Sequence, residues 1–135
     1  MEDIALLILR LVLGGIFVAH GAQKLFGSFG GHGLKGTAGF FEHIGLKPGR
    51  MMALLAGLAE FGGGLLVLVG FLTPLGALAI IVVQAVAIAR VHLPNGFFNE
   101  GGGYEFNLVL IAVAVALILT GSGAYGLDAA LEILW

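Results

Sequence analysis

The 135-residue chain contains no cysteine and very few charged side chains. The missing thiols exclude disulfide bonds, thiol catalysis, and zinc or iron–sulfur sites with cysteine ligands. Charged residues make up 10% of the chain, against about a quarter in soluble domains. So few charges cannot cover the surface of a soluble globule of this length. With 59% hydrophobic residues and a mean hydropathy of +1.09, the chain is predicted to be an integral membrane protein.

Basic residues are also scarce, and the chain lacks a basic N-terminal segment. The net charge of −2 leaves no basic surface for a nucleic-acid backbone, so we expect no nucleic-acid partner. The first apolar run begins after Glu2 and Asp3 and lacks the basic start of a signal peptide. We therefore expect this run to remain in the lipid bilayer as a permanent span.

Four apolar segments are long enough to cross a hydrocarbon core of about 30 Å as helices, which rise about 1.5 Å per residue. Their Leu, Ile, Val and Ala content, without the alternation of barrel strands, favours helices. The predicted fold class is therefore all-α, a single domain over residues 1–135 that forms an integral membrane four-helix bundle. The spans are expected at about 3–26, 50–71, 74–93 and 104–120.

Two long, glycine-rich loops, 27–49 and 94–103, join the spans. Within the first, residues 37–44 are expected to form a short helix at the membrane interface. Residues 127–135 are expected to form a short C-terminal amphipathic helix that ends in an interfacial Trp135. Four spans place both long loops on one side, and lysine and arginine lie on that side rather than near the termini. The positive-inside rule then predicts cytoplasmic long loops.

Polar side chains within membrane helices are candidate functional residues, because burying them in lipid is costly. Arg10 and Lys24 share one face of the first helix with small residues, since they follow a spacing of three and four residues. Glu60 shares a face of the second helix with glycines. Small residues let helices approach closely in lipid. We therefore expect Glu60 to point toward other helices.

Counting residues from the long-loop end places the polar groups at graded depths. We predict a polar funnel that opens on that side and narrows to Glu60, the candidate catalytic residue, as a proton relay. The candidate ligand-binding residues are Arg10, His20, Lys24, Gln84, His92, Glu105 and Asn107.

Several of these residues have a structural alternative. Arg10 can pair with Asp128 as readily as with Glu60, and residues near helix ends such as Lys24 can reach water. His20, Glu60, His92 and Glu105 include ligand types that suit iron, manganese or zinc. The spans lack the Glu-x-x-His pair typical of metal sites in bundles, and the predicted depths are scattered. We therefore predict no metal site.

Short motifs along almost the whole chain resemble, in the right order, the DoxX-like family of small bacterial integral membrane proteins. They are RLVLG at 10–14, HGAQKLFG at 20–27, AEFGG at 59–63, LVGFLT at 68–73, HLPNGFF at 92–98, GGYEFNL at 102–108 and GSGAYGLD at 121–128. The last motif departs from the family, which usually carries proline and a basic residue where Ser122 and Ala124 stand.

The resemblance implies a four-helix protein of the bacterial inner membrane. Members of the family have been linked to thiosulfate oxidation with quinone as acceptor, to oxidative-stress complexes and to aromatic catabolism. We therefore expect the funnel to bind a quinone or another redox-active small molecule. His20 and Lys24 would donate hydrogen bonds to it and Glu60 would relay protons.

Two other functions stay open at this point, as does whether the chain is an enzyme. One is a non-enzymatic membrane anchor that assembles soluble redox or stress enzymes through the long loops. The other is a small-solute transporter, to which a homo-oligomer would supply the missing half of the pathway; the chain lacks the inverted repeat common in transporters.

Overall fold

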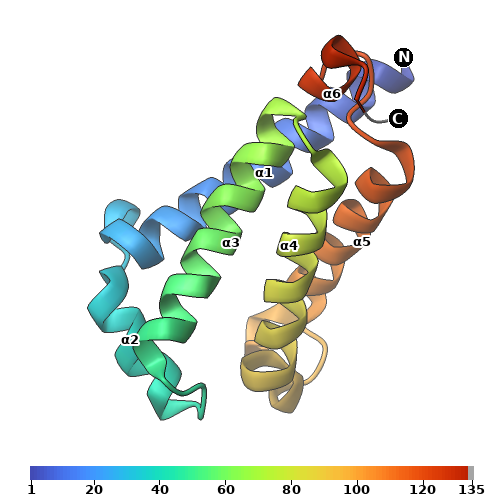
Figure 1. Ribbon diagram of the computed structural model, residues 1–135. Coiled ribbons are helices and arrows are strands. Elements are labelled where there is room, and N and C mark those ends of the chain that lie inside the picture. The colour runs from blue at the N-terminus through green and yellow to red at the C-terminus, as the bar shows by residue number, and fades with distance from the viewer. Residues whose placement is uncertain (134–135) are drawn as a thin grey trace.

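The computed structural model describes residues 1–133, which form helices and no strand. Long helices run between the two ends of the molecule (Figure 1). They are α1 (Glu2–Phe26), α3 (Gly49–Val69), α4 (Thr73–Ala87) and α5 (Glu105–Thr120). Two shorter helices are α2 (Gly33–His43), between α1 and α3, and α6 (Leu127–Leu131). The predicted all-α fold class is confirmed.

Three helical stretches are long and apolar enough to cross a membrane, namely Glu2–Phe26, Gly49–Val69 and Thr73–Asn95. The third continues α4 through a π-helical turn, Ile88–His92, and a 3-10 turn, Leu93–Asn95. The fourth predicted span corresponds to α5, an apolar helix of 16 residues and about 24 Å. Large apolar side chains such as Leu58 and Leu119 are exposed on the outside of the bundle, as contact with lipid requires.

Glycine governs the packing of α1 against α3. A Cβ placed on Gly14 would lie 2.7 Å from the carbonyl oxygen of Gly64, and one placed on Gly21 would overlap the backbone of Phe61. The two backbones are therefore too close for any side chain at these positions. Arg10, Gly14, Glu60 and Gly64 are all buried. The small-residue faces predicted for the first two spans are thus confirmed as contact faces.

The apolar core lies in the half of the bundle nearest the N-terminus and α6. It joins all four long helices and consists of Leu13, Phe17, Val67, Ala77, Ile80, Leu110, Ala114 and Leu117. The end of this half is closed by Asp128, whose carboxylate accepts hydrogen bonds from Leu72 N at 2.6 Å and Thr73 N at 2.9 Å. It also accepts one from the hydroxyl of Thr73 at 2.7 Å. Asp128 thereby caps the N-terminus of α4 from a distant part of the chain.

The short helices differ in extent from the prediction. α2 begins at Gly33, four residues before the predicted start at 37, and ends at His43. α6 ends at Leu131, because Glu132 adopts a left-handed conformation with φ of 55° that cannot continue a right-handed helix. The predicted extent to residue 135 is therefore wrong over 132–133, and Trp135 lies outside the described residues.

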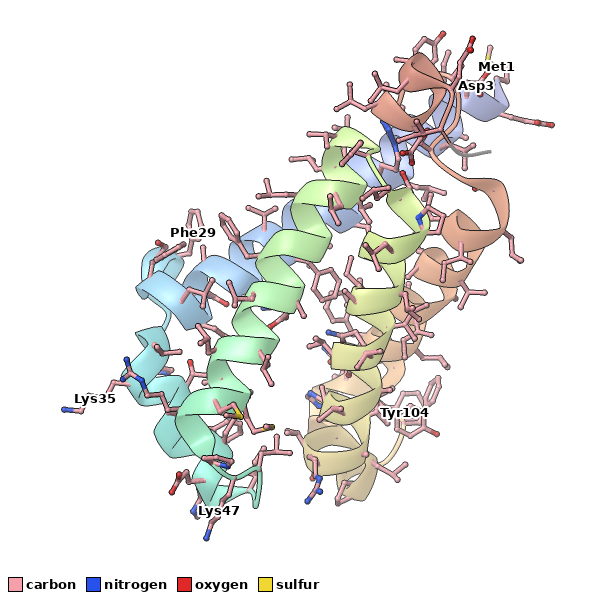
Figure 2. The ribbon with its side chains drawn as sticks, in the orientation of Figure 1. Met1, Asp3, Phe29, Lys35, Lys47 and Tyr104 are labelled. Atoms are coloured by element: carbon pink, nitrogen blue, oxygen red, sulfur yellow. The ribbon has the colours of Figure 1, made fainter. Side chains whose placement is uncertain are left out.

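Lysines and the N-terminus lie at opposite ends of the molecule. Figure 2 shows Lys35 and Lys47 at the end formed by α2 and the start of α3, with Met1 and Asp3 at the end beside α6. Both long loops lie at the lysine end, as Figure 1 shows. We call this the loop end, and the opposite one the terminal end.

Candidate functional site

A cavity of about 910 Å³ lies in the loop-end half of the bundle. Residues of α1, α2 and α3 line one side, and residues of α4, its π-helical turn and α5 line the other. Figure 1 shows α3 and α4 close together toward the terminal end and diverging toward the loop end. They touch at Gly63 and Gly76, where a Cβ on Gly63 would lie 2.9 Å from the Gly76 carbonyl oxygen. The cavity lies between this contact and the loop end.

The predicted site residues divide into those that line the cavity and those that lie elsewhere. Lining it are His20, Lys24, Glu60, Gln84, His92 and Asn107. Arg10 lies at the terminal end, buried, and donates a hydrogen bond to the carbonyl oxygen of Tyr125 at 3.4 Å. Arg10 therefore lies at the same end as Asp128, one of the two possible partners predicted for it from the sequence. Glu60, the other possible partner, lines the cavity in the loop-end half.

Lys24 and Glu60 form an ion pair across the contact between α1 and α3. Nζ of Lys24 lies 2.6 Å from Oε1 of Glu60, and the two side chains are 24% and 3% exposed. Gly57, one turn before Glu60, packs against Leu25 with no room for a side chain. The close helix approach therefore brings the two charges together. Sequence reasoning placed both residues on contact faces but did not identify them as partners.

Gln84 and Asn107 form a second polar pair on the opposite side of the cavity. The Asn107 side-chain nitrogen donates to Oε1 of Gln84 at 2.7 Å, and both residues are buried. This hydrogen bond joins α4 to α5 within an otherwise apolar contact. The cavity thus has one polar pair on each side, and each pair holds two neighbouring helices together.

The π-helical turn carries two further polar residues that line the cavity, Arg90 and His92. Nδ1 of His92 lies 2.8 Å from the carbonyl oxygen of Gly102, which also accepts from Asn95 at 3.2 Å. A carbonyl oxygen can only accept, so Nδ1 of His92 carries a proton and donates it in this hydrogen bond. π-helical turns are frequent at functional sites. Nothing in the sequence IARVH signals this turn.

Glu105 supports the second long loop and is absent from the residues that line the cavity. Its Oε1 accepts a hydrogen bond from the backbone N–H of Asn99 at 2.8 Å. The loop is folded back on itself, with Tyr104 N donating to Gly96 O at 3.1 Å and the ring of Tyr104 packed edge-on against Phe97. Glu105 therefore positions the loop from the start of α5.

The histidine and acidic side chains considered as metal ligands are not gathered at one point. Within residues 1–133, no three side chains of these types lie close enough to hold a metal ion. Glu60 is engaged with Lys24, His92 with Gly102, and Glu105 with Asn99. The cavity is therefore best described as an apolar chamber with polar pairs on its walls.

Comparison with known proteins identifies the family. A family model described as DoxX matches residues 5–93, which include α1 from its fourth residue onward, α2, α3, α4 and the whole π-helical turn. The chain belongs to the DoxX family. Lys24, Glu60, Gln84 and His92 lie within the matched part, and Asn107 lies beyond it. The resemblance drawn from the motifs is thus confirmed.

Relatives from the DoxX family match almost the full chain. The inner membrane protein YqjF of Escherichia coli is 33% identical over 138 residues, covering 100% of this chain and 98% of its own length. A Bacillus subtilis protein with the provisional name of an oxidoreductase, CatD, is 35% identical, covering 93% of this chain and 86% of its own. An uncharacterised membrane protein of Mycobacterium tuberculosis is 28% identical, covering 89% and 77%. No solved structure matches.

These relatives and the apolar helices establish the general character of the molecule. It is a DoxX protein embedded in a membrane, and the name of the Escherichia coli relative agrees with the predicted inner-membrane location.

Proposed function

We propose that this DoxX protein binds a quinone, or a similar redox-active small molecule, in the cavity between its helices. In this proposal it serves as the membrane subunit of a redox or oxidative-stress system. The observation that carries the proposal is an apolar chamber with a polar pair on each of two opposite sides, Lys24–Glu60 and Gln84–Asn107. Apolar cavities with a few convergent polar groups are the usual form of small-molecule sites.

The walls suit the chemistry of a quinone ring, which has two apolar faces and a carbonyl oxygen at each end. Nζ of Lys24 can donate to one carbonyl from the side of α1 and α3. Gln84 accepts through Oε1, so its side-chain NH₂ group is available to donate to the other carbonyl from α4. Aromatic and aliphatic residues between the pairs, such as Phe17 and Leu110, can pack against the ring.

Glu60 is the only carboxylic acid among the residues found to line the cavity. A group that exchanges protons with a bound ligand must lie within hydrogen-bond reach of it. We propose that Glu60 fills this role. Lys24 would hold the carboxylate in place, and His20, which lies one turn before Lys24 on α1 and also lines the cavity, would provide a second group for proton exchange. The oxidoreductase name of the Bacillus relative supports a redox context for this site.

Mass spectrometry of the organic extract from purified protein tests the proposal. Wild-type protein should carry a quinone or related redox-active compound at about one molecule per chain, and Glu60→Gln/His20→Ala protein should have lost most of it. Glu2→Gln/His43→Ala is the matched control, because it makes the same chemical changes at exposed residues outside the cavity. This control should retain the compound.

The proposal is wrong if wild type and both variants carry only bulk lipid after mild extraction, and if added quinone does not bind. That result would favour the anchor function considered from the sequence. Recovery of a stoichiometric soluble enzyme with all three proteins would then support it.

A further inference from the structure

The wall of the cavity between α3 and α4 is formed by apolar side chains that also face outward. Leu55 on α3 and Val82 and Val86 on α4 line the cavity, yet they are 54%, 55% and 41% exposed. Figure 1 shows that no other described helix crosses in front of the space between α3 and α4. We call the opening bounded by these three residues the lateral slot.

The lateral slot lies at the depth of the lipid chains. Leu55 is six residues from the start of α3, and Val82 is six residues before the π-helical turn. At a rise of about 1.5 Å per residue, both lie about 9 Å inside these boundaries. Glu60 lies a further turn and a half along α3. A hydrocarbon chain in the slot would therefore contact lipid at one end and the polar pairs at the other.

The opposite route, through the loop end, has a polar character. Arg90 extends from the π-helical turn toward the connection between α2 and α3, where its Nη1 lies 3.6 Å from the position of a Cβ on Gly45. His92 lines the same end of the cavity. A guanidinium group spans this side of the chamber, so a long apolar chain that left by this path would have to pass a charged side chain.

We infer that the ligand is an amphiphile that enters sideways from the bilayer, with a hydrogen-bonding head at the polar pairs and a hydrocarbon tail in the lateral slot. This inference rests on the proposed quinone function and narrows it to tailed quinones. Moving the tail from lipid to the apolar wall of the slot provides no hydrophobic driving force, because lipid is equally apolar. Binding of the tail therefore depends on whether its shape fits the slot. Filling the slot should therefore exclude tailed molecules and spare tail-free ones.

The test measures equilibrium binding of two quinones to purified protein in lipid nanodiscs. The probes are decylubiquinone and its tail-free parent, dimethoxy-methyl-benzoquinone. The chain has no cysteine with which the unsubstituted ring could react. Leu55→Trp and Val86→Trp fill the slot, while Leu58→Trp and Leu78→Trp add the same side chain at exposed positions outside the cavity.

We expect the slot variants to weaken decylubiquinone binding by about tenfold or more, because an indole would overlap the tail. Binding of the tail-free quinone should change by less than about twofold, which also shows that the variants are folded. The control variants should bind both quinones as wild type does.

Equal loss of binding of both quinones in the slot variants, or no loss of either, would overturn the inference about the tail but not the proposed quinone site. Failure of wild type to bind either quinone would overturn the proposed function, and this inference with it.

Discussion

Lys24 and Glu60 place two opposite charges inside an apolar bundle, where each would be very unfavourable alone. Removing one partner of a buried ion pair is strongly destabilising, whereas replacing both with neutral groups is often tolerated. Because Lys24 is 24% exposed, the effect should be smaller than for a fully buried pair. The contribution of the ion pair to the free energy of unfolding can therefore be measured separately from any role in binding.

Lys24→Met should destabilise the protein by about 2 kcal/mol, since Glu60 would be left without its partner. The double variant Lys24→Met/Glu60→Gln should recover most of the loss. The measurement is the thermal midpoint of each purified protein in the same detergent. A double variant as unstable as Lys24→Met would show that the ion pair is not the source of the effect.

Asp128 accepts three hydrogen bonds from Leu72 and Thr73 at the start of α4. Asp128→Ala should cost about 2 kcal/mol, because two backbone N–H groups and a buried hydroxyl would lose their acceptor. Glu132→Ala, which removes an exposed acid just beyond α6, is the control and should be nearly neutral. Comparison of thermal midpoints tests this, and equal values for the two variants would contradict the capping role.

Residue positions were predictable from the sequence where spacing defines a face. The repeat of small residues around Glu60 indicated that its side chain points toward a neighbouring helix, and Glu60 is buried against α1. The hydrogen bond between Gln84 and Asn107 was not predictable, because α5 after Asn107 is apolar all round, and the sequence does not show which side of the helix faces α4. Arg10, named among the candidate ligand-binding residues, is not among the residues that line the cavity, since distance along a helix does not reveal where a cavity ends.

At the scale of elements, the contact between α1 and α3 depends on glycines that have no room for a side chain. Gly21 would overlap the Phe61 backbone if it carried a Cβ, while Gly15, on the same helix, has open space around it. The two positions form a matched pair for substitution by alanine.

Gly21→Ala should lower stability by about 1–3 kcal/mol, because α1 and α3 would be forced apart. Gly15→Ala should be neutral or raise stability by about 0.5 kcal/mol, since alanine favours the helical conformation. Thermal midpoints in one detergent compare the two. A loss of similar size at Gly15 would mean that the α1–α3 contact does not explain the effect at Gly21.

Helix boundaries were predicted well where apolar runs meet glycine or proline and poorly where backbone geometry decides. The predicted spans agree with the long helices to within two residues when the turns that continue α4 to Asn95 are counted. Two features depend on hydrogen bonding and packing that the residue types do not predict: the π-helical turn at Ile88–His92 and the left-handed conformation of Glu132. These two features determine where Arg90 and His92 lie and where α6 ends.

At the scale of the whole molecule, two helix pairs, α1 with α3 and α4 with α5, are joined at the terminal end and separate at the loop end (Figure 1). Close packing through glycine holds the first pair, and the Gln84–Asn107 hydrogen bond contributes to the second. The apolar core and the Asp128 cap connect the pairs at one end only. The cavity therefore lies between the two helix pairs, in the loop-end half where they separate.

The charge distribution predicts that the loop end faces the cytoplasm. Single cysteines can be introduced without background, because the chain has none. With a membrane-impermeant maleimide, Glu2→Cys should be labelled in cells with a permeable outer layer, and Lys35→Cys only after the inner membrane is opened. The reverse pattern would invert the orientation and leave the fold unchanged.

The central claim is that the cavity between the helix pairs binds a quinone. Photocrosslinking with an azidoquinone, followed by peptide mapping, tests it most directly. The account predicts adducts in residues 17–24, 52–60, 82–92 and 106–110 that excess unlabelled quinone suppresses. Adducts concentrated in residues 1–10 and 120–133, or spread over the lipid-facing surface without competition, would contradict it.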